Sequence, residues 1–365
     1  MLFQSLSFDP KKPYNQLPLL PPQKSVESSV VFKKTISASR ALSELKGAIT
    51  NLPNAHLFVD TLQLQEAQAS SAIENIITTQ DDLFKNSITE SIIKDPAIKE
   101  VLHYKKALWF GIEELTKRPV LTTNLFIKLV QLIKENQEGI RNVPGTQLAN
   151  PVTGAIIYTP PEGEEVIRQK LKNLEDFIHN EDDIDPLIKM AIIHYQFEAI
   201  HPFFDGNGRT GRILLLLYLK LSGLLDKTVL YLSKYIIENK NNYYLKLRKV
   251  TEAQDWEGWI LFMLDMIEQT SRKDRERIIA VDTWMKEMGS IIASRLPKIY
   301  SKELIKVLFK LPYTKRQHLV EAGLGNSKTV GRYLNELEKE GLLKSEPVGK
   351  EKFYVNHRLL SLLKK

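Results

Sequence analysis

The stretch HPFFDGNGRTGR, residues 201–212, says most about how this chain folds and works. Its twelve positions hold one histidine, one aspartate, one asparagine, three glycines and two arginines. The apolar run that follows, ILLLLYLKL at 213–221, is typical of a buried helix. Charged groups at the entrance of a buried helix are costly unless they find partners, so this concentration indicates a functional site.

The three residues Gly206–Gly208 stand just before the expected helix. Glycines let the backbone turn so that several N–H groups point to one spot, and the N-terminus of a helix adds partial positive charge. Arg209 and Arg212 are three positions apart, so they share one helix face and can reach the same polyphosphate. The pattern predicts a phosphate-binding loop.

Two further side chains of the stretch suit a reaction at phosphorus. Asp205 lies at the edge of the expected loop, where a divalent cation bound to phosphate oxygens takes a carboxylate ligand. His201 titrates near neutral pH and can accept a proton from an attacking hydroxyl. The combination predicts phosphoryl or nucleotidyl transfer, in which positioning and charge neutralisation supply most of the catalysis.

HPFFDGNGRTGR resembles, at every defined position, the signature of the Fic family of protein AMP-transferases: His-Pro-Phe-any-Asp/Glu-Gly-Asn-Gly-Arg-any-any-Arg. The resemblance implies that His201 deprotonates a Ser, Thr or Tyr hydroxyl of a target protein, or of the enzyme itself, and that Asp205 holds Mg²⁺ on ATP. The hydroxyl then attacks the α-phosphorus, which leaves AMP on the target and releases pyrophosphate. The residues implied to bind the nucleotide are Gly206, Asn207, Gly208, Arg209, Arg212 and, in the segment IIENKNNYYLKL, Asn239.

The segment GTQLANPVTGAIIYTPP, residues 145–161, predicts a hairpin in a mostly helical chain, because Asn150, Pro151 and Gly154 suit a turn and 155–158 suit a strand. It resembles the target-binding flap of the Fic family. A target peptide could add to it as a further strand, held by backbone hydrogen bonds. The expected flap residues are Gln147, Leu148, Ala149, Ile156, Ile157 and Tyr158.

A second motif, ASSAIENI, lies in a helix predicted at 59–77. Ser70 and Glu74 are four positions apart and so share a helix face, with Asn75 beside them. Beside a Fic signature this matches the inhibitory motif of the family, which implies that Glu74 pairs with Arg212 and misaligns ATP. In some family members the same glutamate serves removal of AMP, and the sequence leaves that reaction open.

The composition of the 365 residues is that of a soluble globular protein. The chain contains no cysteine, which excludes disulfides, thiolate metal sites and a cysteine nucleophile. The N-terminus does not have the pattern of a signal peptide, and the longest apolar run is too short to cross a membrane. The sequence therefore predicts a cytoplasmic protein without a membrane partner. Its first thirty residues, with five prolines, either wrap a body or form a flexible arm.

The C-terminal segment 298–365 carries 15 basic and 7 acidic residues, or +8, while the rest of the chain carries −1. Three helices, at 299–309, 314–322 and 327–340, precede two strands in LLKSEPVGKEKFYVN (342–356), which predicts a winged-helix domain. The third helix would present Ser327, Lys328, Thr329 and Arg332 as a recognition helix. Its partner, DNA or another protein, stays open.

The expected fold class is mainly α. A Fic-type helical core with a β-hairpin flap (101–290) follows an N-terminal arm and helical region with the inhibitory motif (1–100) and precedes the small α+β winged-helix domain (291–365). The other helices are predicted at 37–52, 97–116, 121–135, 164–179, 185–197, 209–222, 239–253 and 255–289.

Two alternatives to the AMP-transferase stay open. One is a DNA-binding regulator whose Fic core senses nucleotide, and the other is a Fic fold that transfers a different phosphate-containing group. The intact His201, Asp205 and arginines favour an enzyme, and the inhibitory glutamate favours AMP. The sequence does not decide the oligomeric state and leaves a homodimer open.

Overall fold

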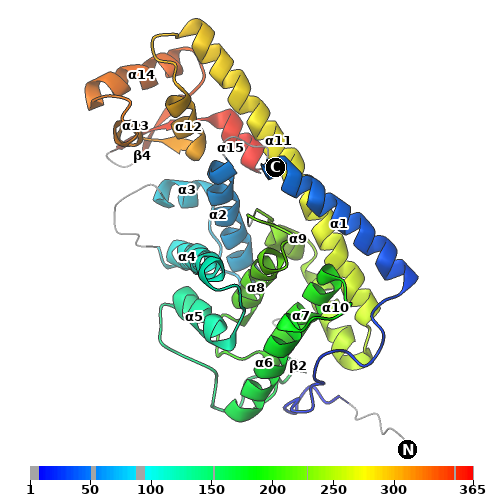
Figure 1. Cartoon of the computed structure of the whole chain (residues 1–365). Coiled ribbons are helices and arrows are strands. Elements are labelled where there is room, and N and C mark those ends of the chain that lie inside the picture. Colours follow the sequence, from blue (N-terminus) through cyan, green and yellow to red (C-terminus); the bar gives the residue numbers. More distant parts are fainter. Residues whose placement is uncertain are drawn as a thin grey trace, which may run out of the picture.

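The computed structural model describes residues 8–50, 55–87, 95–150, 153–227, 229–348 and 351–364. Helices dominate it, as predicted, with two small antiparallel sheets (Figure 1). Up to the flap the elements are α1 (Ser29–Thr50), α2 (Ala55–Ile73), α3 (Gln80–Ser87), α4 (Pro96–Lys117), α5 (Thr123–Lys134), β1 (Leu148–Ala149) and β2 (Ile156–Tyr158). The rest of the helical body consists of α6 (Glu164–His179), α7 (Pro186–Ile200), α8 (Asn207–Leu221), α9 (Leu232–Glu238), α10 (Lys240–Ala253) and α11 (Trp256–Arg295).

The C-terminal domain contains the three predicted helices and the predicted hairpin. Its strands form one sheet in the order β3-β5-β4, with Tyr313 paired to Val355 and Lys344 to the same residue from the other side. The elements are α12 (Lys302–Lys310), β3 (Tyr313–Thr314), α13 (Arg316–Glu321), α14 (Ser327–Lys339), β4 (Lys344–Val348), β5 (Glu351–Val355) and α15 (His357–Lys364).

Helix starts follow local chemistry. The side chains of several residues accept a hydrogen bond from the backbone N–H groups of the first turn, which would otherwise lack partners. Two of these helices, α4 and α7, also have proline at the first position, where the missing N–H costs nothing. The residues that cap in this way are Asp95, Thr122, Asp185, Asp255, Ser301 and Asn326.

The centre of the molecule is the pair α7 and α8. Both helices are buried on nearly every side, as expected for a helix with apolar residues all round. The 40-residue helix α11 runs beside α1 along one side of the body, and the C-terminal domain lies at the end of α11 opposite the N-terminal arm (Figure 1). The pair α7–α8 thus holds the 201–212 loop on a rigid support.

The N-terminal arm wraps the body from residue 8 onward. Lys170 of α6 donates to the Leu17 carbonyl at 2.7 Å, and the Leu20 N–H donates to Asn173 Oδ1 at 2.8 Å. Residues 1–7 lie outside the described part of the chain. Within the described ranges, no helix is long and apolar enough to span a bilayer.

The structure differs from the sequence-based prediction in several short elements. α3, α9, α15 and β3 were not predicted, since none has more than eight residues in which a periodic pattern could develop. The helix predicted at 59–77 ends at Ile73, because Asn75 takes the left-handed conformation with φ 64°. Ser70 is therefore helical, whereas Glu74 and Asn75 lie in the turn that follows.

The proposed boundaries after residues 100 and 290 stay predictions. Both points fall within helices, α4 and α11, so each of these helices is continuous across a proposed boundary.

Candidate active site

The loop between α7 and α8 is held from both ends. His201 ends α7 in the left-handed conformation, with φ 49°, and its carbonyl accepts a hydrogen bond from Arg141 Nε at 2.7 Å. Asn207, the first residue of α8, accepts from the Phe203 N–H and donates to the Phe203 carbonyl, both at 2.8 Å. The polar residues of the motif thus build the loop that presents the histidine.

Gly206 and Gly208 are needed for close packing. Gly206 has φ 84°, and a Cβ there would lie 2.9 Å from Val130 Cγ2. A Cβ on Gly208 would lie 2.5 Å from Glu74 Oε1 and 2.9 Å from Arg212 Nη1. The Glu74 carboxylate therefore rests directly over the first turn of α8, at the position where a helix N-terminus attracts an anion.

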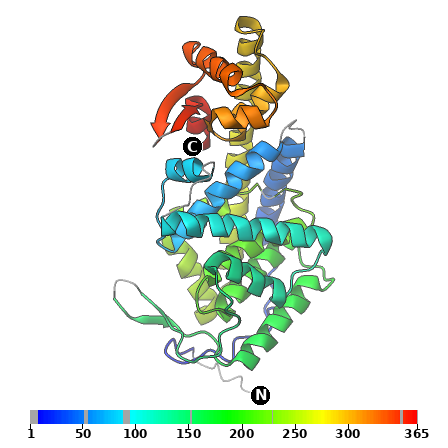
Figure 2. The same ribbon diagram turned by 90° about the vertical axis from the view of Figure 1, so that its left-hand side faces the viewer.

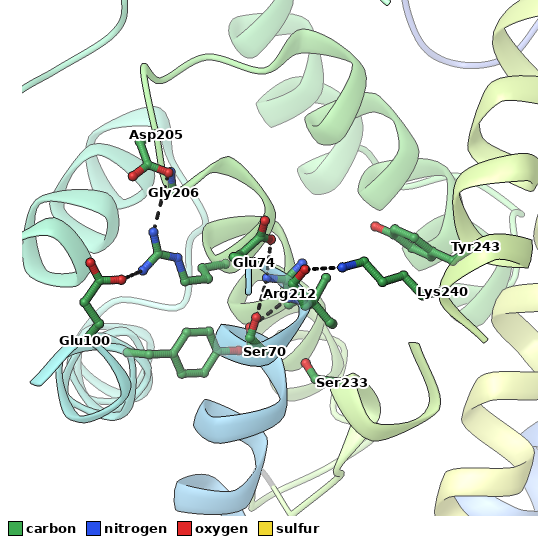
Figure 3. Close-up of polar contacts among 12 residues, drawn as sticks. Ser70, Glu74, Glu100, Asp205, Gly206, Arg212, Ser233, Lys240 and Tyr243 are labelled. Atoms are coloured by element: carbon green, nitrogen blue, oxygen red, sulfur yellow. Dashed lines mark hydrogen bonds and ion pairs between the residues drawn. The ribbon is translucent and has the colours of Figure 1, made fainter. Parts of the chain in front are cut away.

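Arg212 is the centre of the contact between α8 and the segment that contains Ser70 and Glu74 (Figure 3). Its Nη2 lies 2.7 Å from Glu74 Oε1 and 2.9 Å from the Ser70 carbonyl, and its Nε donates to Ser70 Oγ at 2.7 Å. The arginine side chain is 2% exposed and the glutamate side chain 35%. Desolvation alone would raise the pKa of Glu74, but the charge and hydrogen bond of Arg212 outweigh it and lower that pKa. The structure thus brings together the two motifs that the sequence separates by more than a hundred residues.

Arg209 does not share the partners of Arg212. Its Nη1 lies 2.7 Å from Glu100 on α4, and its Nη2 lies 3.5 Å from Asp205. Lys134 on α5 completes a ring of alternating charges, 2.6 Å from Asp205 and 3.5 Å from Glu100. Desolvation would raise the pKa of Asp205, but the hydrogen bond and charge of Lys134 outweigh it, so that pKa is lowered and the carboxylate stays ionised. The two arginines therefore sit in separate ionic networks.

The surroundings of the His201 imidazole disfavour its charged form. Burial and the positive charge of Arg141 lower the pKa of His201 to about 4. The ring is therefore neutral at neutral pH, which is the form that a general base requires.

The predicted flap is present as β1 and β2, a short pair in which Leu148 pairs with Tyr158 and Ala149 with Ile156. Leu148 and Ala149 are exposed, as is the neighbouring Gln147, while Ile157 is partly buried. In the predicted turn, residues 151–152 lie outside the described part of the chain. The flap extends from the body near the N-terminal arm (Figure 2).

The base of the flap is tied to the loop that carries the histidine. The Tyr158 hydroxyl donates to the Ala199 carbonyl at 2.8 Å, two residues before His201. Arg141 donates to the carbonyl of Ile200, one residue before the histidine, and to the carbonyl of Pro161, three residues after the end of β2. A peptide added to β1 would therefore lie on a strand pair anchored next to the histidine.

Asn239 directly precedes α10 but does not cap it with its side chain, whose Nδ2 donates instead to the Tyr235 carbonyl at 2.9 Å. Its predicted role in a base pocket stays a prediction. The next residue, Lys240, reaches the end of α2 and donates to the Ile73 carbonyl at 2.5 Å, one residue before Glu74 (Figure 3). The 236–247 segment thus borders the site from the side opposite Glu100.

Sequence reasoning did not identify Glu100, Lys134, Arg141 or Lys240 as site residues. Glu100 and Lys134 lie on α4 and α5 and occupy ordinary helix positions. No local spacing marks them, because they meet the 201–212 loop only through packing of the helices.

The arrangement suits a magnesium–nucleotide complex. Asp205 offers a carboxylate that is 62% exposed, next to the helix N-terminus. Among the residues that the structure describes, no three His, Cys, Asp or Glu side chains gather as a preformed metal site. Mg²⁺ is commonly bound by one or two carboxylates together with substrate phosphates, so the residues present fit a metal that arrives with the nucleotide.

Fold and site together define a class: helical proteins in which a loop and a helix N-terminus form an anion site next to a histidine. The chain belongs to the Fic/DOC family. The model of the Fic/DOC family N-terminal region matches residues 32–113, that of the Fic/DOC family itself 120–219, and that of the protein adenylyltransferase SoFic-like C-terminal domain 284–359.

Relatives and solved structures agree with this assignment. A probable protein adenylyltransferase of Aquifex aeolicus is 32% identical over 184 residues, 49% of this chain and 54% of that protein. The protein adenylyltransferase Fic-1 of Caenorhabditis elegans is 46% identical over 68 residues, 18% of this chain and 13% of the relative. The matches thus span about half or less of the length of these relatives.

The fold resembles a Fic family protein from Desulfovibrio desulfuricans G20, with a TM-score of 0.56 at 18% identity over 92% of this chain and 98% of the other. It also resembles a Fic domain-containing signalling protein from Bacteroides thetaiotaomicron, with a TM-score of 0.54 at 18% identity over 68% and 97%.

Proposed function

We propose that this protein is a protein adenylyltransferase, which moves AMP from ATP to a Ser, Thr or Tyr hydroxyl of a target protein, itself included. The names of the relatives support the reaction class. The observation that carries the proposal is the anion site at the start of α8, formed beside Gly208 and Arg212 and filled by the Glu74 carboxylate. A site that holds a carboxylate in this way has the charge and geometry for a phosphate.

In the proposed reaction His201 accepts the proton of the target hydroxyl. The hydroxyl oxygen forms a bond to the α-phosphorus of ATP, and the bond from that phosphorus to the bridging oxygen breaks, releasing pyrophosphate. The first turn of α8 orients the phosphates through its N–H groups, and Arg212 binds the γ-phosphate once Glu74 has left. Asp205 would hold Mg²⁺, which neutralises phosphate charge when bound.

We further propose that Glu74 keeps the enzyme inactive. With Arg212 engaged by Glu74 and Ser70, ATP cannot place its γ-phosphate on that guanidinium, and the α-phosphate is misplaced for in-line attack. Misplacement of about 1 Å costs roughly 10²-fold in rate.

Incubation with labelled ATP and Mg²⁺ tests both proposals. We expect weak self-labelling of the wild type, roughly 10²-fold more in Glu74→Gly, and none in Glu74→Gly combined with His201→Ala. Mass spectrometry of the labelled residue identifies the transferred group, so an adduct other than AMP would favour the alternative Fic chemistry. An unlabelled but folded Glu74→Gly variant would contradict the enzymatic function and favour a nucleotide sensor. Cytoplasmic location and dimerisation are outside this test.

A second candidate function, binding of duplex DNA, is favoured by the exposed face of α14. Lys328, Arg332, Asn335 and Lys339 repeat at three- and four-residue spacing and are exposed, whereas the opposite face is buried. Two acidic residues near the helix end have partners of their own: Glu338 accepts from the Ser345 N–H at 2.7 Å, and Glu340 pairs with Arg295. A stripe of basic residues on an outward helix fits the phosphate backbone of a duplex.

Fluorescence anisotropy with a labelled DNA duplex tests this candidate. Charge reversal of Lys328 and Arg332 to Glu should weaken binding at least 10-fold and reduce its salt dependence. Charge reversal of Lys33 and Lys46 on α1 gives the same net charge away from this surface and should change binding less. If both double variants weaken binding equally, binding responds to net charge alone. If the wild type does not bind DNA, a protein is the remaining partner of the C-terminal domain.

A further inference from the structure

Two adjacent buried side chains of the inhibitory helix α2, Gln65 and Glu66, reach different parts of the molecule. Glu66 faces the body, where it accepts from the Ser233 N–H at 2.9 Å, from Ser233 Oγ at 2.5 Å and from the Tyr104 hydroxyl at 3.2 Å. Gln65 faces the C-terminal domain, where its Nε2 donates to the Leu363 carbonyl on α15 at 2.6 Å. Each side chain is 1% exposed. Hydrogen bonds at these two adjacent positions thus hold α2 from two sides.

Gln65 lies close to the proposed inhibitory contact along the axis of α2. Gln65 precedes Ser70 by five positions in the same uninterrupted helix, which is roughly 7.5 Å along its axis. Ser70 and Glu74 hold Arg212 at 2.7 Å each. A helix of this length moves as a rigid unit, so a shift at Gln65 carries Ser70 with it.

The C-terminal domain makes further contacts beside Gln65. Lys364 at the end of α15 lies 3.0 Å from Asp81 on α3, and the Phe84 ring packs against Tyr313 with centroids 6.4 Å apart. These contacts place α2 and α3 against one side of the domain, as Figure 1 shows.

The same domain is anchored on α11. Trp284 Nε1 donates to Asn356 Oδ1 at 3.0 Å, and the Arg358 guanidinium lies 4.2 Å from the Trp284 ring centroid. The domain therefore connects the long helix α11 to the inhibitory helix.

We propose that Gln65 is a positioning residue for the inhibitory contact, through which α15 of the C-terminal domain holds Glu74 against Arg212. A partner that displaces α15 would release α2 on this side and expose the phosphate site of α8. The inference rests on the proposed AMP transfer and assigns its control to the C-terminal domain.

The test combines Gln65→Leu with Glu74→Gly and measures self-labelling and melting temperature. Gln65→Leu removes the donor and leaves the Leu363 carbonyl unpaired, so we expect labelling to rise about 3- to 10-fold over the wild type. In the Glu74→Gly background the same substitution should add nothing, because the contact that it controls is already gone. Multiplying effects in the double variant, or unchanged labelling by a folded Gln65→Leu, would overturn the proposal.

Amide hydrogen exchange gives a readout that does not depend on catalysis. Residues 70–76 should exchange faster in Gln65→Leu than in the wild type, while α7 exchanges as before. Unchanged exchange at 70–76 would overturn the proposed positioning role of Gln65, even if Glu74→Gly proves unable to transfer AMP. Absence of labelling in Glu74→Gly alone would instead contradict the proposed function.

A charge swap on the surface covers the case in which Gln65→Leu does not fold. Lys364→Glu places like charges against Asp81 and should raise labelling about 2-fold, and Asp81→Lys in the same chain should restore the wild-type rate. The matched control Lys298→Glu, exposed in the turn between α11 and α12, should leave the rate unchanged. A rate that Asp81→Lys fails to restore would contradict the proposed route.

Discussion

Arg212 and Glu74 show how one buried ion pair can define two states of a site. Removing one partner of such a pair leaves an uncompensated charge, so the arginine requires an anion in either state. Glu74 provides that anion in this structure, and a phosphate would provide it after release. The Glu74 carboxylate and a bound phosphate would both lie over the first turn of α8. The close approach at Gly208 therefore matters in either state.

Gly208→Ala should reduce transfer strongly without unfolding the protein. A Cβ there would lie 2.5 Å from the Glu74 oxygen, in the space that a phosphate would occupy. In the Glu74→Gly background we expect labelling to fall roughly 10²-fold, measured with labelled ATP. Gly47→Ala is the control, since a Cβ at that position meets nothing within 4 Å. Equal labelling by both alanine variants would show that the space above α8 is not the phosphate site.

The pH profile of transfer should follow the lowered pKa of His201. Burial and Arg141 lower this pKa to about 4, so the free enzyme keeps its neutral imidazole well below pH 6.5. For Glu74→Gly, kcat/KM should therefore hold as the pH falls from 7 to about 5.5. A half-maximal rate near pH 6.5 would indicate an ordinary histidine, and the Arg141→Leu variant should move the profile toward that value.

Helix α2 carries its own pH dependence through Glu66. Burial raises the pKa of this carboxyl from 4.5 to about 7, against the opposing bonds from Ser233 and the charge of Arg212. Between these pH values the unfolded chain has released the proton that the folded protein keeps. The contribution of Glu66 to stability is therefore complete below pH 4.5 and is lost as the pH rises through 7.

Glu66→Gln should remove this dependence. Relative to the wild type, the free energy of unfolding of the variant should gain on the order of 3 kcal/mol between pH 4.5 and 8, measured by urea denaturation at both pH values. Glu268→Gln is the control, because the pKa of Glu268 is lowered to about 2 by Lys34, Ser37 and Arg272 despite desolvation. Between pH 4.5 and 8 that residue stays ionised in the folded protein, so the control difference should change by well under about 1 kcal/mol. A constant difference between wild type and Glu66→Gln would contradict the raised pKa.

For the whole molecule, the attachment of the C-terminal domain to α11 depends on Asn356. This residue is 1% exposed, accepts from Trp284 Nε1 and caps α15 through the Leu359 N–H, each at 3.0 Å. Asn356→Ala should lower the free energy of unfolding by about 2–3 kcal/mol, since it leaves a buried indole N–H unpaired and removes a cap. Asn326→Ala, which removes an exposed cap on α14, should cost about 1 kcal/mol. Equal losses in chemical denaturation would show that the Trp284 contact adds nothing.

Local patterns in the sequence were sufficient for much of this structure. Long helices such as α6 and α11 were predicted from apolar spacing, and the C-terminal domain from three helices and a hairpin. The resemblance to the Fic signature, which lies in twelve consecutive residues, indicated the site residues from His201 to Arg212. Ser70, Glu74 and Asn75 were indicated by their resemblance to the inhibitory motif of the Fic family, although the turn at Asn75 ends the helix before Glu74.

Contacts between distant segments were decided by the tertiary structure alone. Glu100 and Lys134 join Arg209 and Asp205 only because α4 and α5 pack beside α8. Gln65 meets Leu363, almost three hundred residues away, only because the C-terminal domain folds back onto α2. Propensity and periodicity act within a few turns of the chain. The partner of a charge buried by packing depends on how the whole helical body assembles, and local sequence does not contain that information.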